Sequence, residues 1–298
     1  MTGDPPAPRS LGPLGKATIY VEGHDPGLLF AVDREPQRRT LPLAAQGPLA
    51  GHDRWTAWEA SWLDSTGKPQ VSVVRFVVPA ASPRIVESKS VKLYLTALNN
   101  TVFAHSAAYA ASLTDDLSTA VGTPVEVELI APEHYVRLAR RELPGICIDE
   151  VALVDKGTPT GADVRTDVTD ARTAARREAD ASQLICDGPP VDEMLYTRLF
   201  RSLCPVTTQP DYASVHIRYR GPRIDHAGLL AYLLSYRHHA GFHEHCTERI
   251  AADLLHRCRP EALEVTACFT RRGGIDINPW RYHGLVERQS ILASTPVQ

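Results

Sequence analysis

The residues best suited to chemistry are Cys204 and Asp211, which lie seven residues apart. Two prolines and two threonines stand between them, and proline cannot continue a helix, so the stretch predicts a shaped loop. Residues 214–219 then alternate polar and apolar side chains, which is typical of a half-buried strand. A thiol needs a base, an acid or a positive neighbour to act as a nucleophile, so this pair suits covalent catalysis with proton transfer. The alternative is a small buried cysteine without chemistry.

A histidine-rich stretch, residues 237–246, is the second candidate. An alanine–glycine pair interrupts its helical pattern, so His243 and Glu244 are expected to open a new helix. His243 would share the buried face of that helix with Cys246, which suits acid–base chemistry. Two alternatives stay open. One is a metal site of His239, His243 and Cys246, and the other is a core histidine with solvated neighbours.

The segment Glu87–Lys92 is expected to start a helix. Helix starts favour anions through their free N–H groups and the macrodipole. Lys89 and Lys92 add charge that suits a phosphate, and the Glu87 carboxylate can accept two donors from the edge of a planar base. The alternative is an ordinary capping segment with a solvated face.

Two arginines precede two glycines at Arg271-Arg272-Gly273-Gly274. Guanidinium groups beside a glycine backbone that a ligand can approach closely suit phosphate binding. The alternative is a glycine turn with surface arginines. The sequence contains neither GxGxxG nor GxxxxGK[ST], so it carries neither a Rossmann fingerprint nor a P-loop.

The elements that must position these residues occur twice along the chain. Each half reads as strand, strand, helix, helix, strand, with room for one more strand. The expected elements are 55–63, 71–78, 93–102, 107–121 and 125–130 in the first half, and 210–219, 225–237, 243–258 and 263–269 in the second. The counterpart of Cys204 falls near Leu63, and Asp225–Gly228 stands where the first half has Glu87–Ser90. The pattern predicts an α+β fold in which two helices pack on one face of each antiparallel sheet.

Composition limits the class of protein. The 298 residues are 43% hydrophobic and 22% charged, which is ordinary for a soluble globular chain. The net charge of −3, from 32 basic and 35 acidic residues, argues against bulk attraction to nucleic acid or anionic membranes. The N-terminus lacks a signal-peptide core, and no apolar run is long enough to span a membrane. Six scattered cysteines without a CxxC pair are expected to be free thiols in a reducing cytoplasm.

Taken together, four motifs resemble those of the NADPH-dependent 7-cyano-7-deazaguanine reductases of queuosine biosynthesis, in their long two-module form. The resembling motifs are residues 87–92, 202–211, 237–244 and 271–279, and the likeness covers the chain from Leu14 to about residue 285. Val91 and Tyr212-Ala213 depart from the usual leucine and Trp-Gly of the family, and neither departure removes a reacting group. The resemblance implies a tunnelling fold with two tandem modules. Its expected divisions are an arm at 1–50, a module at 51–133, a connector at 134–190 and a catalytic module at 191–298.

The resemblance also implies a reaction, the reduction of the nitrile to the aminomethyl group of 7-aminomethyl-7-deazaguanine with two NADPH. Cys204 would form a thioimide, Asp211 would act as general acid–base, and His243 would assist proton transfer after the first hydride. The implied substrate-binding residues are Glu87, Ser88 and Glu244, and the implied NADPH-binding residues are Lys89, Ser90, Lys92, Arg271, Arg272 and Gly273. A cytoplasmic homodimer is implied, with no metal and with no direct contact to nucleic acid or membrane.

Two other functions stay open on the sequence alone. One is a zinc-dependent tunnelling-fold enzyme of the pterin or GTP cyclohydrolase type, which bound zinc or turnover of GTP would favour. The other is a duplicated purine-binding module without catalysis, which would bind a purine tightly and consume no NADPH.

Overall fold

One continuous sheet organises the structure. In the computed structural model, which describes residues 21–42, 47–139, 142–153 and 178–284, eight strands lie in the order β5-β3-β2-β10-β9-β8-β7-β6. Neighbouring strands are antiparallel except β6 and β7, which are parallel. The strands are β2 (Ala50–Leu63), β3 (Pro69–Pro79), β5 (Glu126–Ile130), β6 (Ile146–Cys147), β7 (Pro190–Leu203), β8 (Pro210–Pro222), β9 (Ala262–Phe269) and β10 (Ile275–His283).

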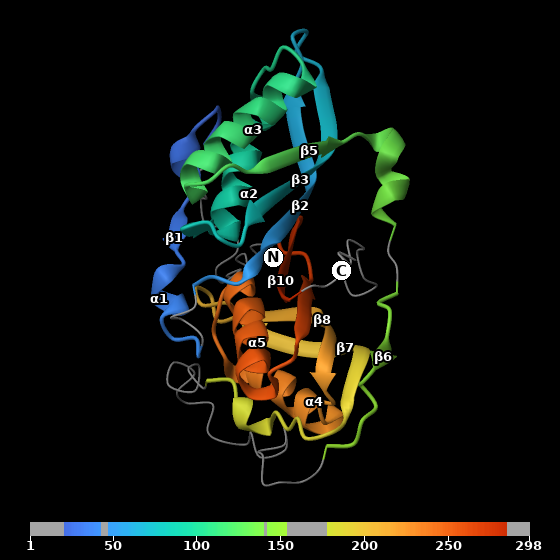
Figure 1. Cartoon of the computed structure of the whole chain (residues 1–298). Coiled ribbons are helices and arrows are strands. Elements are labelled where there is room, and N and C mark those ends of the chain that lie inside the picture. Colours follow the sequence, from blue (N-terminus) through green and yellow to red (C-terminus); the bar gives the residue numbers. More distant parts are fainter. Residues whose placement is uncertain (1–20, 43–46, 140–141, 154–177, 285–298) are drawn as a thin grey trace, which may run out of the picture.

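Each half of the sheet carries a pair of helices. These are α2 (Ser88–Ala97) and α3 (Ser106–Val121) in the first half, and α4 (His226–Ser235) and α5 (His243–Cys258) in the second. The arm contributes β1 (Ala31–Asp33), which pairs with β4 (Arg84–Val86), and the one-turn helix α1 (Glu35–Arg38). Short 3-10 turns lie at Pro26–Leu28, Leu98–Asn100, Pro132–Leu138, Ala181–Gln183 and Tyr236–His238. Figure 1 shows the blue-to-green half above the yellow-to-red half, with β2 and β10 at the join.

Local sequence explains why these helices form. In α5, the apolar side chains of Cys246, Ile250 and Leu254 recur every four residues and are all fully buried, as an amphipathic helix requires. The helix α3 ends where Gly122 adopts a left-handed conformation with φ 77°, which glycine reaches without the steric cost that a side chain brings.

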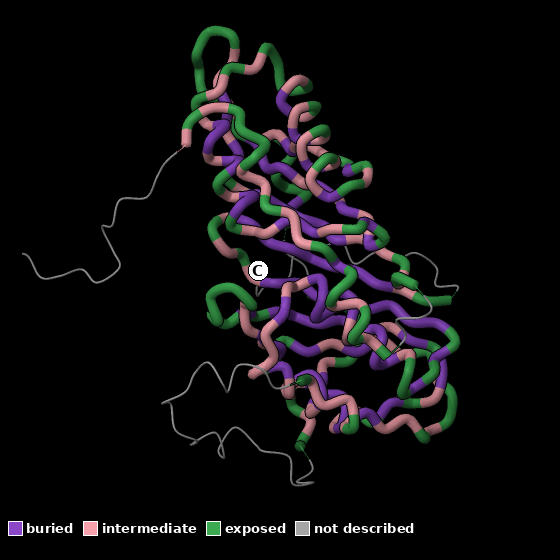
Figure 2. The backbone as a smooth tube through the Cα atoms, turned by 90° about the vertical axis from the view of Figure 1, so that its left-hand side faces the viewer, coloured by how far each residue is buried: buried purple, intermediate pink, exposed green. Residues whose placement is uncertain are grey.

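The apolar core divides between the halves. One cluster is built around Trp55 and Phe76 of the first half, and the other is built around Phe200 and Phe269 of the second. The strand β10 crosses this division, because its Ile275 belongs to the cluster of the first half. Figure 2 shows buried stretches running through the strands of both halves and exposed residues at the loops. The two halves therefore share packing as well as strand pairing.

The internal duplication is visible in the strand registers. Leu63 pairs with Pro69 at the tip of β2–β3, and Leu203 pairs with Pro210 at the tip of β7–β8. Both hairpins change register six residues before that tip. The counterpart of Cys204 is therefore Asp64 rather than Leu63, one residue from the position that the sequence predicts.

The α+β class and the tunnelling-fold arrangement of helix pairs on antiparallel strands are confirmed. The strands of the two modules join into one sheet through β2 and β10 instead of forming separate sheets. The limits of the arm, modules and connector remain a prediction, and parts of the arm and connector (1–20, 43–46, 140–141, 154–177), with residues 285–298, lie outside the described residues. Among the helices that the structure describes, none is long and apolar enough to cross a membrane.

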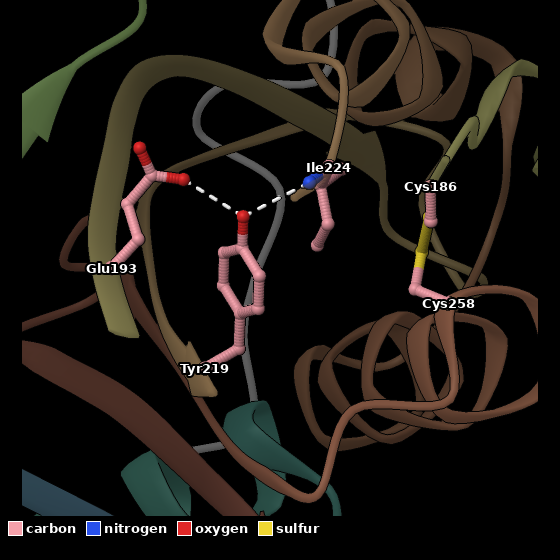
Figure 3. Close-up of a disulfide and its surroundings, with 5 residues drawn as sticks. All are labelled: Cys186, Glu193, Tyr219, Ile224 and Cys258. Atoms are coloured by element: carbon pink, nitrogen blue, oxygen red, sulfur yellow. Dashed lines mark hydrogen bonds between the residues drawn. A yellow bond between two sulfur atoms is a disulfide. The ribbon is translucent and has the colours of Figure 1, made fainter. Parts of the chain in front are cut away.

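The expectation that all six cysteines are free thiols is wrong for one pair. Cys186 and Cys258 form a disulfide, while Cys147, Cys204, Cys246 and Cys268 are free. Figure 3 shows this bond at the end of α5. In the same view the Tyr219 hydroxyl donates to Glu193 at 2.7 Å and accepts from the Ile224 N–H at 3.0 Å, which ties the end of β8 to the chain entering α4. The disulfide joins Cys186 and Cys258, which are 72 residues apart in the sequence, so only folding of the chain brings the two thiols together.

Candidate active site

A pocket that is open to solvent lies where the two halves meet. The first half contributes Trp55, Val86, Glu87 and Ser88. The second contributes Cys204, Pro205, Asp211, Gly241, Phe242, His243, Glu244, Arg272 and Ile277. All six residues that the sequence predicts for catalysis and substrate binding line this one pocket: Cys204, Asp211, His243, Glu87, Ser88 and Glu244.

Cys204 begins a tight loop between β7 and β8. The Cys204 N–H donates to the Gln209 carbonyl at 2.9 Å, and the Thr208 N–H donates to the Cys204 carbonyl at 2.9 Å. Thr208 takes a left-handed conformation with φ 56°, which is uncommon for a residue with a branched side chain. The loop is therefore closed on itself, and it presents the half-buried Cys204 to the pocket.

The loop favours the ionised form of its thiol. Burial raises the pKa of Cys204, but hydrogen bonds outweigh that effect and leave the pKa below its ordinary value. The donors are the Thr207 hydroxyl, the Thr207 and Val206 N–H groups and the Arg272 side chain. Sulfur held in this way is more nucleophilic at neutral pH than a free thiol.

Asp211 is buried, and it is held from two sides. Its Oδ1 accepts from Arg272 Nε at 2.8 Å and lies 3.3 Å from His243 Nε2. The His243 ring stacks on Phe269, with ring centroids 3.8 Å apart and planes 7° from parallel. Within the described chain, no group bonds the buried Nδ1 of His243. The arrangement couples a carboxyl group to an imidazole whose orientation is fixed, as acid–base chemistry needs.

Glu244 is 2% exposed, and burial raises its pKa to about 7. The nearby Asp53 carboxylate contributes to this raised pKa, whereas His243 and Arg34 oppose it. Glu87 faces the same pocket from the first half. Two carboxyl groups from different halves therefore line one pocket, where both can accept hydrogen bonds from one polar ligand.

The Glu87 carboxylate also caps α2. It accepts from the Lys89 N–H at 2.9 Å and from the Ser90 N–H at 2.8 Å. The Ser90 hydroxyl donates to the Glu87 carbonyl at 2.6 Å and accepts from the Phe30 N–H at 3.0 Å. Ser90 is therefore engaged in holding the helix start and the arm, and does not line the pocket. Glu87 therefore caps α2, as the alternative interpretation expected, and it also lines the pocket.

The other residues predicted to bind NADPH, apart from Arg272, lie around one rim. The Lys92 stem passes close to Gly273, so α2 lies against the turn between β9 and β10. Lys89 is exposed one helical turn before Lys92, and Lys92 pairs with the exposed Glu59 at 3.0 Å. Arg271 is exposed, with its guanidinium 4.5 Å from the centre of the Trp58 ring. Lys89, Lys92 and Arg271 thus form a basic rim, whereas Arg272 turns toward the catalytic loop.

Sequence reasoning missed the apolar wall of the pocket. Trp55, Phe242 and Ile277 line it, and each belongs to a pattern that equally fits an ordinary strand or helix start. It also missed the buried Arg34, which the sequence places in an arm of unremarkable composition. The periodicity of β2 and β10 signals which residues face inward, but it does not show which of them face a pocket.

The proposed metal ligands do not gather into a ligand set. His239 precedes α5, Cys246 is fully buried inside it, and His243 contacts Asp211. Nowhere in the described ranges do three or more His, Cys, Asp or Glu side chains meet in a way that would hold a metal ion. This arrangement gives no support to the zinc-dependent alternative.

Comparisons with known proteins identify the family of the chain. Residues 20–129 match the family described as nitrile reductase, 7-cyano-7-deazaguanine-reductase N-terminal part, and residues 210–288 match the QueF-like protein family. The chain is 46% identical over 269 residues to the NADPH-dependent 7-cyano-7-deazaguanine reductase of Burkholderia lata, covering 90% of this chain and 92% of that one. It is 46% identical over 274 residues to the enzyme of the same name from Bordetella pertussis, covering 91% and 93%. A crystal structure of the archaeosine synthase QueF-Like in the apo form has a TM-score of 0.29 at 18% identity, covering 34% of this chain and 99% of that one.

Proposed function

The chain belongs to the family of NADPH-dependent 7-cyano-7-deazaguanine reductases, and we propose that it reduces the nitrile of 7-cyano-7-deazaguanine to an aminomethyl group in the pocket between its halves. The observation that carries this proposal is the meeting of Cys204, Asp211 and Glu244 from one half with Glu87 from the other. The product, 7-aminomethyl-7-deazaguanine, serves the tRNA modification queuosine.

Cys204 and Asp211 perform the first step. A nitrile carbon is weakly electrophilic, so covalent capture by sulfur prepares it for reduction. The Asp211 carboxylate takes the thiol proton, the sulfur bonds to the nitrile carbon, and the proton passes to the nitrile nitrogen. The C≡N bond becomes C=N–H, and the substrate is held on Cys204 as a thioimide. The apolar wall of Trp55 and Phe242 limits the water that would hydrolyse it.

The basic rim fits NADPH. Lys89 and Arg271 are exposed cations beside the pocket, and the left-handed Gly273, with φ 54°, exposes backbone that a phosphate can approach. When bound there, NADPH would supply a hydride to the substrate carbon in each of two rounds. His243 gives a proton to the nitrogen in the first round, and its contact with Asp211 lets the two groups share protons. The C–S bond then breaks, Cys204 leaves as a thiolate, and the protonated imine that remains becomes the amine when it receives the second hydride.

Two carboxylates recognise the base. The guanine-like edge offers adjacent N–H donors, which pair with carboxylate oxygens. Glu244 lies at the buried end of the pocket, Glu87 lies at its wall in the first half, and Ser88 follows Glu87 at the start of α2. With the base edge on Glu244, we expect the nitrile to point toward Cys204, which lines the same pocket.

The test is to add 7-cyano-7-deazaguanine without NADPH and measure the intact mass. The protein is expected to gain the full mass of the substrate, because thioimide formation is an addition. Cys204→Ala should gain nothing, whereas Cys147→Ala, which changes another partly exposed free thiol, should gain the same mass as the unmodified chain. Asp211→Asn should bind the substrate without forming the adduct. An unchanged mass for the unmodified chain with substrate bound would remove Cys204 as the nucleophile.

We further propose a homodimer that works in the cytoplasm, where NADPH is available. The exposed apolar residues Tyr135 and Val136 follow the edge strand β5, and the exposed Ile146 belongs to the edge strand β6. Edge strands can pair with another chain. Light scattering of the purified protein checks the oligomer, and a monomeric mass at micromolar concentration would rule the dimer out.

A further inference from the structure

We propose that Arg272 is a positioning residue for the nitrile addition: its guanidinium holds Asp211 and the closing end of the catalytic loop, and it keeps Cys204 in the reactive form. The inference rests on the proposed function and deepens it. It differs from the cofactor-phosphate role that the sequence resemblance implies for this arginine.

The contacts of the guanidinium carry the proposal. Arg272 Nε donates to Asp211 Oδ1 at 2.8 Å. Its Nη2 donates to the carbonyls of Gln209 at 3.2 Å and Pro210 at 3.3 Å. Arg272 also contributes to lowering the pKa of the Cys204 thiol. The Nε and Nη2 groups of Arg272 therefore donate to the loop and to Asp211. The side chain is only 30% exposed. A planar guanidinium can hold several acceptors at once in this way, whereas an ammonium cannot.

The turn that carries Arg272 fixes its direction. The Arg272 N–H donates to the Ile275 carbonyl at 2.9 Å, and the Ile275 N–H donates to the Arg272 carbonyl at 3.0 Å. The left-handed Gly273 and Gly274 complete this tight turn. Neighbouring Arg271 points elsewhere, over the Trp58 ring. The two adjacent arginines thus face different targets. We therefore assign the positioning role to Arg272 and leave the cofactor role to Arg271.

The duplicated loop shows what Arg272 adds. In the first half Asp64 occupies the Cys204 position, and its carboxylate accepts from the Thr66 N–H at 2.9 Å and from the Thr66 hydroxyl at 2.6 Å. These bonds lower the pKa of Asp64. Both loops therefore place hydrogen-bond donors around an anion at their first position. A thiol ionises far less readily than a carboxyl group, so the same loop needs an additional cation when it carries cysteine.

The experiment measures the alkylation of Cys204 by iodoacetamide against pH, without substrate or NADPH, and identifies the modified peptide by mass. Arg272→Gln is expected to move the midpoint for Cys204 upward by about one pH unit, because a donor is lost and Asp211 is left uncompensated beside the pocket. Arg272→Lys keeps the charge without the fork, and an intermediate midpoint is expected. Cys147 in the same samples is an internal reference whose midpoint should not move.

Arg271→Gln is the matched control. It is expected to raise the KM for NADPH and to leave the Cys204 midpoint where it is. Thermal unfolding first checks that Arg272→Gln is folded. If its Cys204 midpoint then equals that of the unmodified chain, the positioning role is overturned, even if the KM for NADPH rises. Failure of the proposed function looks different: the unmodified chain would form no adduct with 7-cyano-7-deazaguanine, while the alkylation titration would still report on Arg272 and Cys204.

Discussion

Burial makes a sulfur anion unfavourable, yet Cys204 has a pKa below that of an ordinary thiol because the loop directs donors at it. Cys246 shows what burial alone does. It lies fully buried in α5, and burial raises its pKa to about 12. The contrast between two thiols of one chain shows that residue surroundings, more than residue type, decide which cysteine can react.

Glu244 predicts a pH dependence of substrate binding. Burial raises its pKa to about 7, so the free pocket holds a protonated carboxyl below that pH. A protonated carboxyl cannot accept two N–H donors, so binding must expel the proton. The affinity for 7-cyano-7-deazaguanine should therefore fall by about tenfold from pH 8 to pH 6.

The binding measurement uses Cys204→Ser, so that no covalent adduct forms and the equilibrium is reached. Calorimetry at a series of pH values gives the affinity directly. Glu244→Gln, whose amide does not titrate, should bind weakly and show a flat profile. Equal affinities at pH 6 and pH 8 in the Cys204→Ser protein would show that Glu244 does not receive the base edge.

At the scale of elements, the helix starts of α2 and α4 offer a matched test. Glu87 caps α2 from within the pocket, whereas Asp225 caps α4 by accepting from the Gly228 N–H at 2.9 Å. Each substitution to alanine should cost about 1 kcal/mol of unfolding free energy through the lost cap. Only Glu87→Ala should also weaken substrate binding, because only Glu87 lines the pocket.

Urea unfolding and substrate titration of the two variants separate the roles of Glu87. Loss of stability in both variants with normal binding in Glu87→Ala would mean that Glu87 serves as a cap alone. Loss of binding in Asp225→Ala would mean that the helices respond as one unit and that the comparison does not isolate Glu87.

The sequence predicted the elements whose signals are local. Helix α5 begins at His243, where the glycine before it interrupts the pattern, and β9 follows the alternation at Leu263. Strand β10 was only partly foreseen, since Pro279 and the polar residues around it are unusual in a strand. Its position is set by pairing with β2, more than 200 residues earlier in the chain. Local patterns do not contain that information.

Much of the site could be predicted because its residues form compact motifs that resemble one family. Their joint placement follows from the duplication, which puts the loop of one half beside a helix start of the other. The orientation of Arg272 could not be predicted, because a glycine turn with arginines fits either a phosphate or a carboxylate partner. The apolar wall at Trp55 also depends on how the halves meet.

At the scale of the whole molecule, a buried charge network ties the arm to both halves. Asp53 of β2 bonds to Arg34 of the arm and, at 2.8 Å, to Arg281 of β10, and all three side chains are fully buried. Arg38 of α1 extends the network by bonding to Glu248 of α5 at 2.8 Å. Asp53 also contributes to the raised pKa of Glu244, which lines the pocket, so the charge of this network is felt there.

Asp53→Asn should destabilise the protein by about 3–5 kcal/mol, because two buried guanidinium groups lose their counter-charge. Burial raises the pKa of Asp53, but Arg281 and Arg34 outweigh burial and lower it to about 2. A lowered carboxyl pKa gives stability that is complete above the ordinary value of 3.8 and is lost as the pH falls through about 2. The difference in unfolding free energy between the unmodified chain and Asp53→Asn should therefore shrink between pH 4 and pH 2, as urea unfolding at each pH would show.

Asp192→Asn is the control for this comparison. It removes a half-exposed carboxylate 3.8 Å from Arg218 and should cost less than about 1 kcal/mol of unfolding free energy. An equal cost for both variants would contradict a central role for the network.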